Sequence, residues 1–117
     1  MSWSGLDQRA FPRLSARCDI AIHDRQFGQG LKAKTQNVGA GGVCVILDRA
    51  LEKLSQVRLR LTLVESEKPL ECDGRVVWMV RSKEPASGKV SFDTGIEFLN
   101  LFPEDQTRLE HFIQSSS

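Results

Sequence analysis

The sequence predicts an all-β fold: a six-stranded antiparallel β-barrel with one C-terminal α-helix. Three observations lead to this fold class. Five segments alternate apolar and polar residues, as strands with one buried face do, and a sixth is a short apolar run opened by glycine. Glycine or proline occurs in the connections between them, and the last segment changes to a helical period. Because six one-sided strands have edges that must be covered, closure into a barrel is the simplest arrangement.

The predicted strands follow one another between residues 17 and 99. They are 17–24, 30–37, 41–47, 57–63, 70–80 and 89–99. The clearest is VRLRLTL (57–63), with Val57 and Leu59 on one face and Arg58 and Arg60 on the other. In the fifth strand, alternation places Trp78 on the face of Val76, which favours the core. A position near the barrel mouth would instead let this indole stack on a purine.

The final segment, PEDQTRLEHFIQ (103–114), predicts the helix. Pro103 suits a first helical position, acidic residues follow it, and an apolar stripe would cover one end of the barrel. The length of 117 residues argues for one domain. We expect a flexible N-terminal arm at residues 1–16, the barrel and helix at 17–114, and a disordered tail at 115–117.

Charge and cysteine content narrow the classes of function. The net charge is only +1, so nucleic acid is not an expected partner. Residues 1–35 carry six Lys or Arg against three Asp, a local +3, which favours a small anionic ligand. The three cysteines form no C-x-x-C motif and suit a reduced cytosolic chain. Without a signal peptide or an apolar run long enough for a membrane span, a cytoplasmic location is expected.

No catalytic apparatus stands out in the sequence. The two histidines, His23 and His111, lie on separate predicted elements, and neither has a nucleophile signature beside it. We therefore expect neither an enzyme nor a bound cofactor or metal ion.

Two short motifs are candidates for ligand binding. In DQRAFPRL (7–14), Arg9 and Arg13 are four residues apart; such a pair alone is more commonly solvated surface charge. The segment NVGAGGV (37–43) matches neither the P-loop nor the dinucleotide-binding glycine pattern. Its glycines would allow a positive φ in a strand connection, or let a ligand approach the backbone N–H groups. The amide of Asn37 offers both a donor and an acceptor.

Together, these motifs resemble the PilZ domain family. The family pattern is R-x-x-x-R followed by [D/N]-x-S-x-x-G between two strands of a six-stranded barrel. Arg9 and Arg13 match the first motif, and Asn37 and Gly42 match the second. The segments GRVVWMV (74–80) and TGIEFLNL (94–101) are similar to the family's penultimate and closing strands.

The resemblance implies a receptor for cyclic di-GMP that acts on an unidentified downstream protein. The implied ligand-binding residues are Arg9, Arg13, Asn37, Gly39 and Gly42, with Gln8 and Trp78 as further candidates. An arginine fork matches the guanine O6 and N7 atoms or a phosphate group.

One departure from the family pattern leaves other functions open. Gly39 occupies the serine position, so a hydrogen bond worth about 0.5–1.5 kcal/mol is missing. The alternative is a PilZ-like protein-interaction adaptor with weak or lost nucleotide binding. A small barrel for single-stranded nucleic acid would need a basic groove with exposed aromatic residues, against which the charge and the few aromatics count.

Overall fold

The computed structural model describes residues 13–24 and 30–116. It contains the six predicted strands, a short additional strand and the predicted C-terminal helix. The elements are β1 (Arg13–Leu14), β2 (Asp19–His23), β3 (Gly30–Gly39), β4 (Gly42–Leu47), β5 (Gln56–Thr62), β6 (Leu70–Lys83), β7 (Val90–Leu99) and α2 (Pro103–Ser116).

The long strands close into an antiparallel barrel, as the sequence predicted. The order in the sheet is β1-β3-β2-β5-β6-β7-β4, and a further pairing of β3 with β4 joins the two ends. Every pair of neighbouring strands is antiparallel. β2 and β5 are paired on both sides for most of their length, whereas β3 passes from β2 to β4 and β6 from β5 to β7 along theirs. Closure therefore gives every long strand a partner along its length.

The barrel interior is filled by the inward half of each alternating pattern. The fully buried side chains are mainly branched aliphatic residues, which suit a narrow barrel lumen. They include Ile22, Val38, Val43, Val45, Leu59, Leu61, Leu70, Val76 and Ile96. Of the residues predicted to face inward in 57–63, Leu59 and Leu61 are at 0% exposure and Val57 is at 3%, while Leu63 is partly buried.

Two boundaries differ from those expected from the sequence. Strand β1 lies within residues 1–16, which carry no apolar periodicity, and it exists because its backbone pairs with β3. Helix α2 includes residues 115 and 116, where the tail was expected to begin. The Ser115 hydroxyl donates to the His111 carbonyl at 2.7 Å, which is a bond inside the last helical turn.

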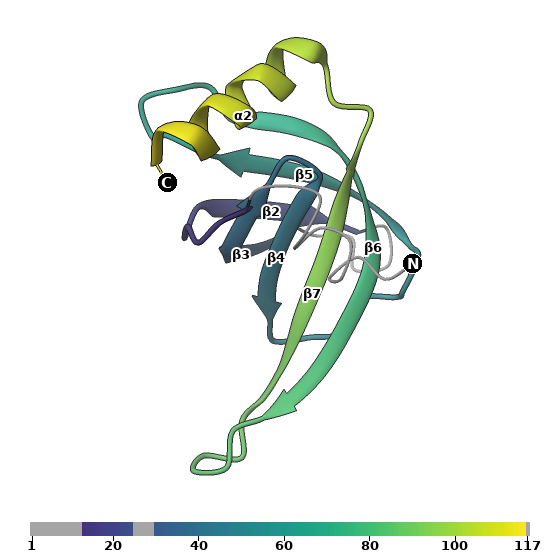
Figure 1. Cartoon of the computed structure of the whole chain (residues 1–117). Coiled ribbons are helices and arrows are strands. Elements are labelled where there is room, and N and C mark those ends of the chain that lie inside the picture. Colours follow the sequence, from purple (N-terminus) through teal and green to yellow (C-terminus); the bar gives the residue numbers. More distant parts are fainter. Residues whose placement is uncertain (1–12, 25–29, 117) are drawn as a thin grey trace.

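Helix α2 lies at one end of the barrel, and the β6–β7 hairpin projects beyond the other end (Figure 1). Leu109 and Ile113 of the helix are buried in the core. The helix contacts both β3 and β1. In the part of the chain described by the structure, no helix is long and apolar enough to cross a membrane.

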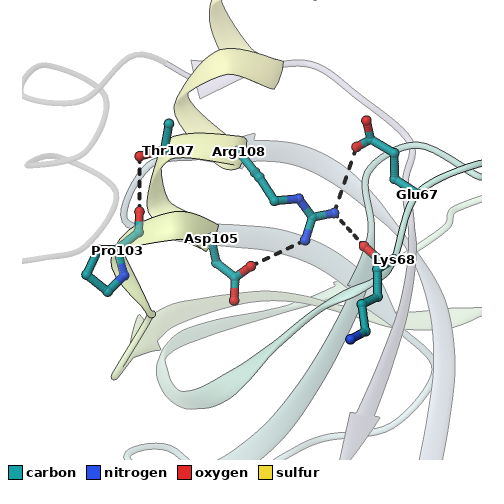
Figure 2. A network of polar contacts seen from close by, with 6 residues as sticks. All are labelled: Glu67, Lys68, Pro103, Asp105, Thr107 and Arg108. Atoms are coloured by element: carbon teal, nitrogen blue, oxygen red, sulfur yellow. Dashed lines mark hydrogen bonds and ion pairs between the residues drawn. The ribbon is translucent and has the colours of Figure 1, made fainter.

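Arg108 fastens this helix to the loop between β5 and β6 (Figure 2). Its Nη1 lies 3.3 Å from Asp105 Oδ1, one helical turn earlier. Its Nη2 donates to the Lys68 carbonyl and lies 3.8 Å from Glu67 Oε1. The planar guanidinium can satisfy three acceptors at once, so it fixes the position of the helix as well as adding charge pairing.

Candidate ligand-binding site

The pairing of β1 with β3 brings the two sequence motifs together. Arg13 of the first motif lies opposite Gly39 of the second, and Leu14 lies opposite Val38. Leu14 packs against the core, which holds this short strand in place. The backbone of Arg13 is therefore within two residues of Asn37 along the sheet. Gln8, Arg9 and the side chain of Arg13 lie outside the described residues.

Two β-bulges determine which side chains reach the outside of the barrel. On β3, the register shifts between Thr35 and Asn37, and on β6 it shifts between Val76 and Trp78. Each bulge adds one residue to its strand, so the side chains beyond it change face. Thr35 and Val76 are buried inside the barrel. Asn37 and Trp78 are consequently turned to its outer surface.

Four residues form a row across this outer surface. Asn37 lies opposite Cys44, Cys44 opposite Gly95, and Gly95 opposite Trp78. Their neighbours Val43, Val45 and Ile96 are fully buried, which places the row on the opposite face from the core. We call Asn37, Cys44, Gly95 and Trp78 the outer row.

The expectation that Trp78 shares the inward face of Val76 is wrong. The bulge at Val77 breaks the alternation from which that expectation came. The indole instead lies over Gly95: a Cβ atom at Gly95 would be 2.2 Å from Trp78 Nε1. The Nε1 atom is buried and has no hydrogen-bond partner among the described residues.

The glycines of the second motif lie on the same outer face. Gly39 is two residues beyond Asn37 on β3, and Gly42 is two residues before Cys44 on β4. Both belong to extended strands, so the positive φ expected in this connection is not found there. Among the described glycines, Gly88 in the β6–β7 turn has the left-handed φ, at +72°. A requirement for positive φ therefore does not explain Gly39 or Gly42.

An ion pair at the edge of this face compensates a negative charge there. Glu97 lies opposite Gly42 on the neighbouring strand. Its Oε1 is 2.7 Å from Arg75 Nη2 and accepts a hydrogen bond from Arg75 Nε at 2.9 Å. The pairing compensates the carboxylate that stands nearest to Gly42 across the strand, which favours an anionic ligand there.

Thr35 is a buried polar residue that the sequence reasoning did not single out. Its Oγ1 donates to the Ala16 carbonyl at 2.6 Å and accepts from the Cys18 amide at 2.8 Å. Its own amide donates to the Cys18 carbonyl at 2.9 Å. These three bonds fasten the chain between β1 and β2 to β3, beside the site. Alternation places Thr35 on the face of Leu31 and Ala33, but it does not show that the hydroxyl holds the neighbouring segment.

Replacing Thr35 by Val should destabilise the fold by about 1–2 kcal/mol. The shape is conserved, but the buried Cys18 amide and Ala16 carbonyl lose their partner. Urea unfolding measures the loss, and faster hydrogen exchange at the Cys18 amide locates it. Thr62→Val is the matched control, because the hydroxyl of this half-buried threonine makes no hydrogen bond to the described residues. Equal stability of both variants would show that the anchor contributes nothing.

Cys18 and Cys72 belong to the core and offer no reactive thiolate. All three thiols are free and buried. Burial raises the pKa of Cys72 to about 11, against a smaller opposing effect of Arg58. Burial likewise raises the pKa of Cys18, with an opposing hydrogen bond to Thr35. Both thiols are therefore protonated at neutral pH. Within residues 13–24 and 30–116, no group of three or more His, Cys, Asp or Glu could hold a metal ion.

Comparison with known proteins identifies the family. The PilZ domain family model matches residues 7–115, nearly the whole chain. The chain belongs to the PilZ domain family. No functionally curated protein sequence matches it.

Solved structures of PilZ proteins have the same fold. The PilZ domain of YcgR from Escherichia coli, solved with c-di-GMP, is 16% identical with a TM-score of 0.74. The match covers 93% of this chain and 91% of that one. The inhibitor of motility MotI/DgrA from Bacillus subtilis is 23% identical with a TM-score of 0.70, over 93% of this chain and 49% of that one. The c-di-GMP complex of MrkH from K. pneumonia is 16% identical with a TM-score of 0.74, over 92% and 51%. The PilZ chain described here spans about half the length of MotI and MrkH.

Proposed function

We propose that this PilZ domain is a receptor for cyclic di-GMP that passes the signal to a partner protein. The observation that carries the proposal is the pairing of Arg13 with Gly39. It places the backbone of Arg13, the last residue of the arginine motif, beside the Asn37–Gly42 segment. The structures of the YcgR PilZ domain and of MrkH with c-di-GMP support the same ligand for this chain.

The outer face suits a ligand with two guanines and two phosphates. Arg9 and Arg13 would supply planar forks for a guanine edge or a phosphate. The Asn37 amide would pair with a guanine edge, and Gly39 and Gly42 would let the ligand approach the backbone. The Trp78 indole N–H has no acceptor among the described residues, so a ligand oxygen at this point would satisfy it. Gln8 is a further candidate contact, next to Arg9.

The competing proposal is an adaptor that binds proteins without strong nucleotide binding. Gly39 favours it, because the family pattern has a serine hydroxyl at this position. The loss of one hydrogen bond corresponds to roughly a tenfold weaker affinity. A tenfold loss is small compared with the affinity that two arginine contacts would contribute, so we favour the receptor function.

Calorimetric titration with cyclic di-GMP, with GMP as the control ligand, tests the proposal. A receptor gives saturable binding of cyclic di-GMP and much weaker binding of GMP, since one guanine nucleotide cannot span both motifs. No heat of binding with either ligand would favour the adaptor. Binding of an oligonucleotide instead would favour the single-stranded nucleic-acid class.

Replacing Gly39 by Ser should tighten cyclic di-GMP binding by a factor of order ten at most. The hydroxyl would restore one hydrogen bond to the ligand. Backbone strain is not expected, because Gly39 lies in the extended strand β3. Affinity from calorimetry and stability from urea unfolding should be measured on the same variant. An unchanged affinity at preserved stability would mean that this position does not face the ligand.

A further inference from the structure

An open hollow of about 480 Å³ lies beside the outer row. Along β3, it lies on the N-terminal side of Asn37. Its lining residues come from three segments: the chain between β1 and β2, strand β3 and strand β4. They are Ser15, Arg17, Lys34, Thr35, Gln36 and Ile46. Ile46 is 41% exposed and gives the hollow an apolar surface. None of these residues belongs to the two PilZ motifs.

Arg17 is held at this hollow by its neighbours in the chain. The Ala16 carbonyl and the Cys18 amide are both bound to the Thr35 hydroxyl, so the backbone on either side of Arg17 is fixed to β3. Arg17 also follows Arg13 by four residues, which extends the arginine spacing of the first motif to Arg9, Arg13 and Arg17. A rigid backbone reduces the entropy lost when this side chain binds a ligand.

Arg17 is the uncompensated cation of the hollow. Lys34 Nζ lies 2.6 Å from Asp19 Oδ1, so its charge is paired. Arg17 is exposed and makes no ion pair or hydrogen bond to the described residues. Its guanidinium fork is therefore available for a planar ligand edge that carries acceptors, whereas the Gln36 amide oxygen already accepts a hydrogen bond from Cys44 Sγ at 3.8 Å.

We propose that this hollow holds one guanine of the bound cyclic dinucleotide and that Arg17 recognises its O6 and N7 atoms. The inference rests on the proposed function. An apolar surface of Ile46 suits the face of a base, and the hollow is much larger than a phosphate group requires. Guanine presents two acceptors to an arginine fork, whereas adenine presents an acceptor and an N6 donor. The hollow therefore selects guanine over adenine.

The placement along β3 fits a ligand with two bases. Gly39, which meets the arginine motif, lies four residues from Thr35 at the hollow. At about 3.3 Å per residue, this separation is roughly 13 Å. A single guanine cannot reach both positions, whereas a cyclic dinucleotide can place one base at each. Arg9, Arg13 and Asn37 would then bind one half of the ligand, and Arg17 the base of the other half.

Calorimetry with two ligands tests the assignment. Cyclic di-GMP is compared with 3′,3′-cyclic GMP–AMP, which has the same two phosphates but only one guanine. The wild-type chain should prefer cyclic di-GMP by about fivefold or more, the low end of discrimination by one bidentate contact. Arg17→Ala and Arg17→Lys should both lose this preference, because lysine lacks the planar fork. Arg60→Ala removes an exposed arginine from β5 and should keep it.

The outcomes separate this inference from the function on which it rests. A preference that disappears in both Arg17 variants and persists in Arg60→Ala supports guanine recognition by Arg17. An unchanged preference in Arg17→Ala, or one retained by Arg17→Lys, would overturn it while leaving the receptor function intact. Equal weakening of both ligands would assign Arg17 to a phosphate instead and would also overturn it. Failure of the wild-type chain to bind cyclic di-GMP would overturn the proposed function together with this inference.

Discussion

Replacing Arg9 and Arg13 together by Ala should reduce cyclic di-GMP affinity by about a hundredfold or more. Each single replacement should cost more than tenfold, about 1.4 kcal/mol, because a charge-assisted fork to the ligand is lost. The melting temperature should hardly change. Arg13 contributes its backbone to the pairing with Gly39, and alanine retains that backbone. Calorimetry and thermal unfolding on the same samples measure both quantities.

Two controls make the arginine result specific. Arg60→Ala removes one positive charge from an exposed position on β5 and should bind like wild type. Arg13→Lys keeps the charge but lacks the fork, so it should not restore the affinity. If the double variant binds as tightly as wild type, the arginine motif is surface charge and the binding face lies elsewhere.

Replacing Gly95 by Ala should destabilise the domain by up to about 3 kcal/mol. The added Cβ would be 2.2 Å from Trp78 Nε1 and 2.3 Å from Cε2, so the ring must move. The same displacement should weaken cyclic di-GMP binding, since Trp78 lies on the proposed binding face. Urea unfolding and calorimetry measure the two effects.

A double-mutant cycle identifies the indole as the cause of that cost. In a Trp78→Ala background the added methyl group meets no ring, so Gly95→Ala should be neutral or slightly stabilising there. The coupling between the two replacements should therefore be large. The same destabilisation in both backgrounds would show instead that the strand itself, rather than the contact with Trp78, requires glycine.

The six strands and the helix could be predicted because each carries its own local pattern of apolar residues. The alternation in 57–63 identifies the buried residues of β5 without knowledge of any neighbour. The apolar stripe of 103–114 likewise predicts which side of α2 packs on the barrel. Strand β1 has two residues and no pattern, and its existence depends on pairing with β3, which is tertiary information.

The site was less predictable because it depends on bulges and on burial of single polar groups. Trp78 was assigned to the wrong face, since a one-residue bulge at Val77 reverses the alternation and leaves no mark in composition. Gly95 carried a weak signal, because a glycine inside a strand often marks a close approach. Thr35 shares the face of Leu31 and Ala33, and Arg17 repeats the spacing of the arginine motif, but neither pattern singles the residue out. Their roles come from the course of the chain between β1 and β2 across β3.

Backbone amide chemical shifts during a titration with cyclic di-GMP show whether this outer face binds the ligand. We expect saturable shifts at Arg13, Asn37, Gly39, Gly42 and Gly95, with the amides of the exposed β6–β7 turn (84–89) unaffected. The Trp78 indole N–H should shift with them, as it gains an acceptor. Shifts confined to other strands, or none at saturating ligand, would contradict the claim that this outer face of the PilZ barrel is the receptor site.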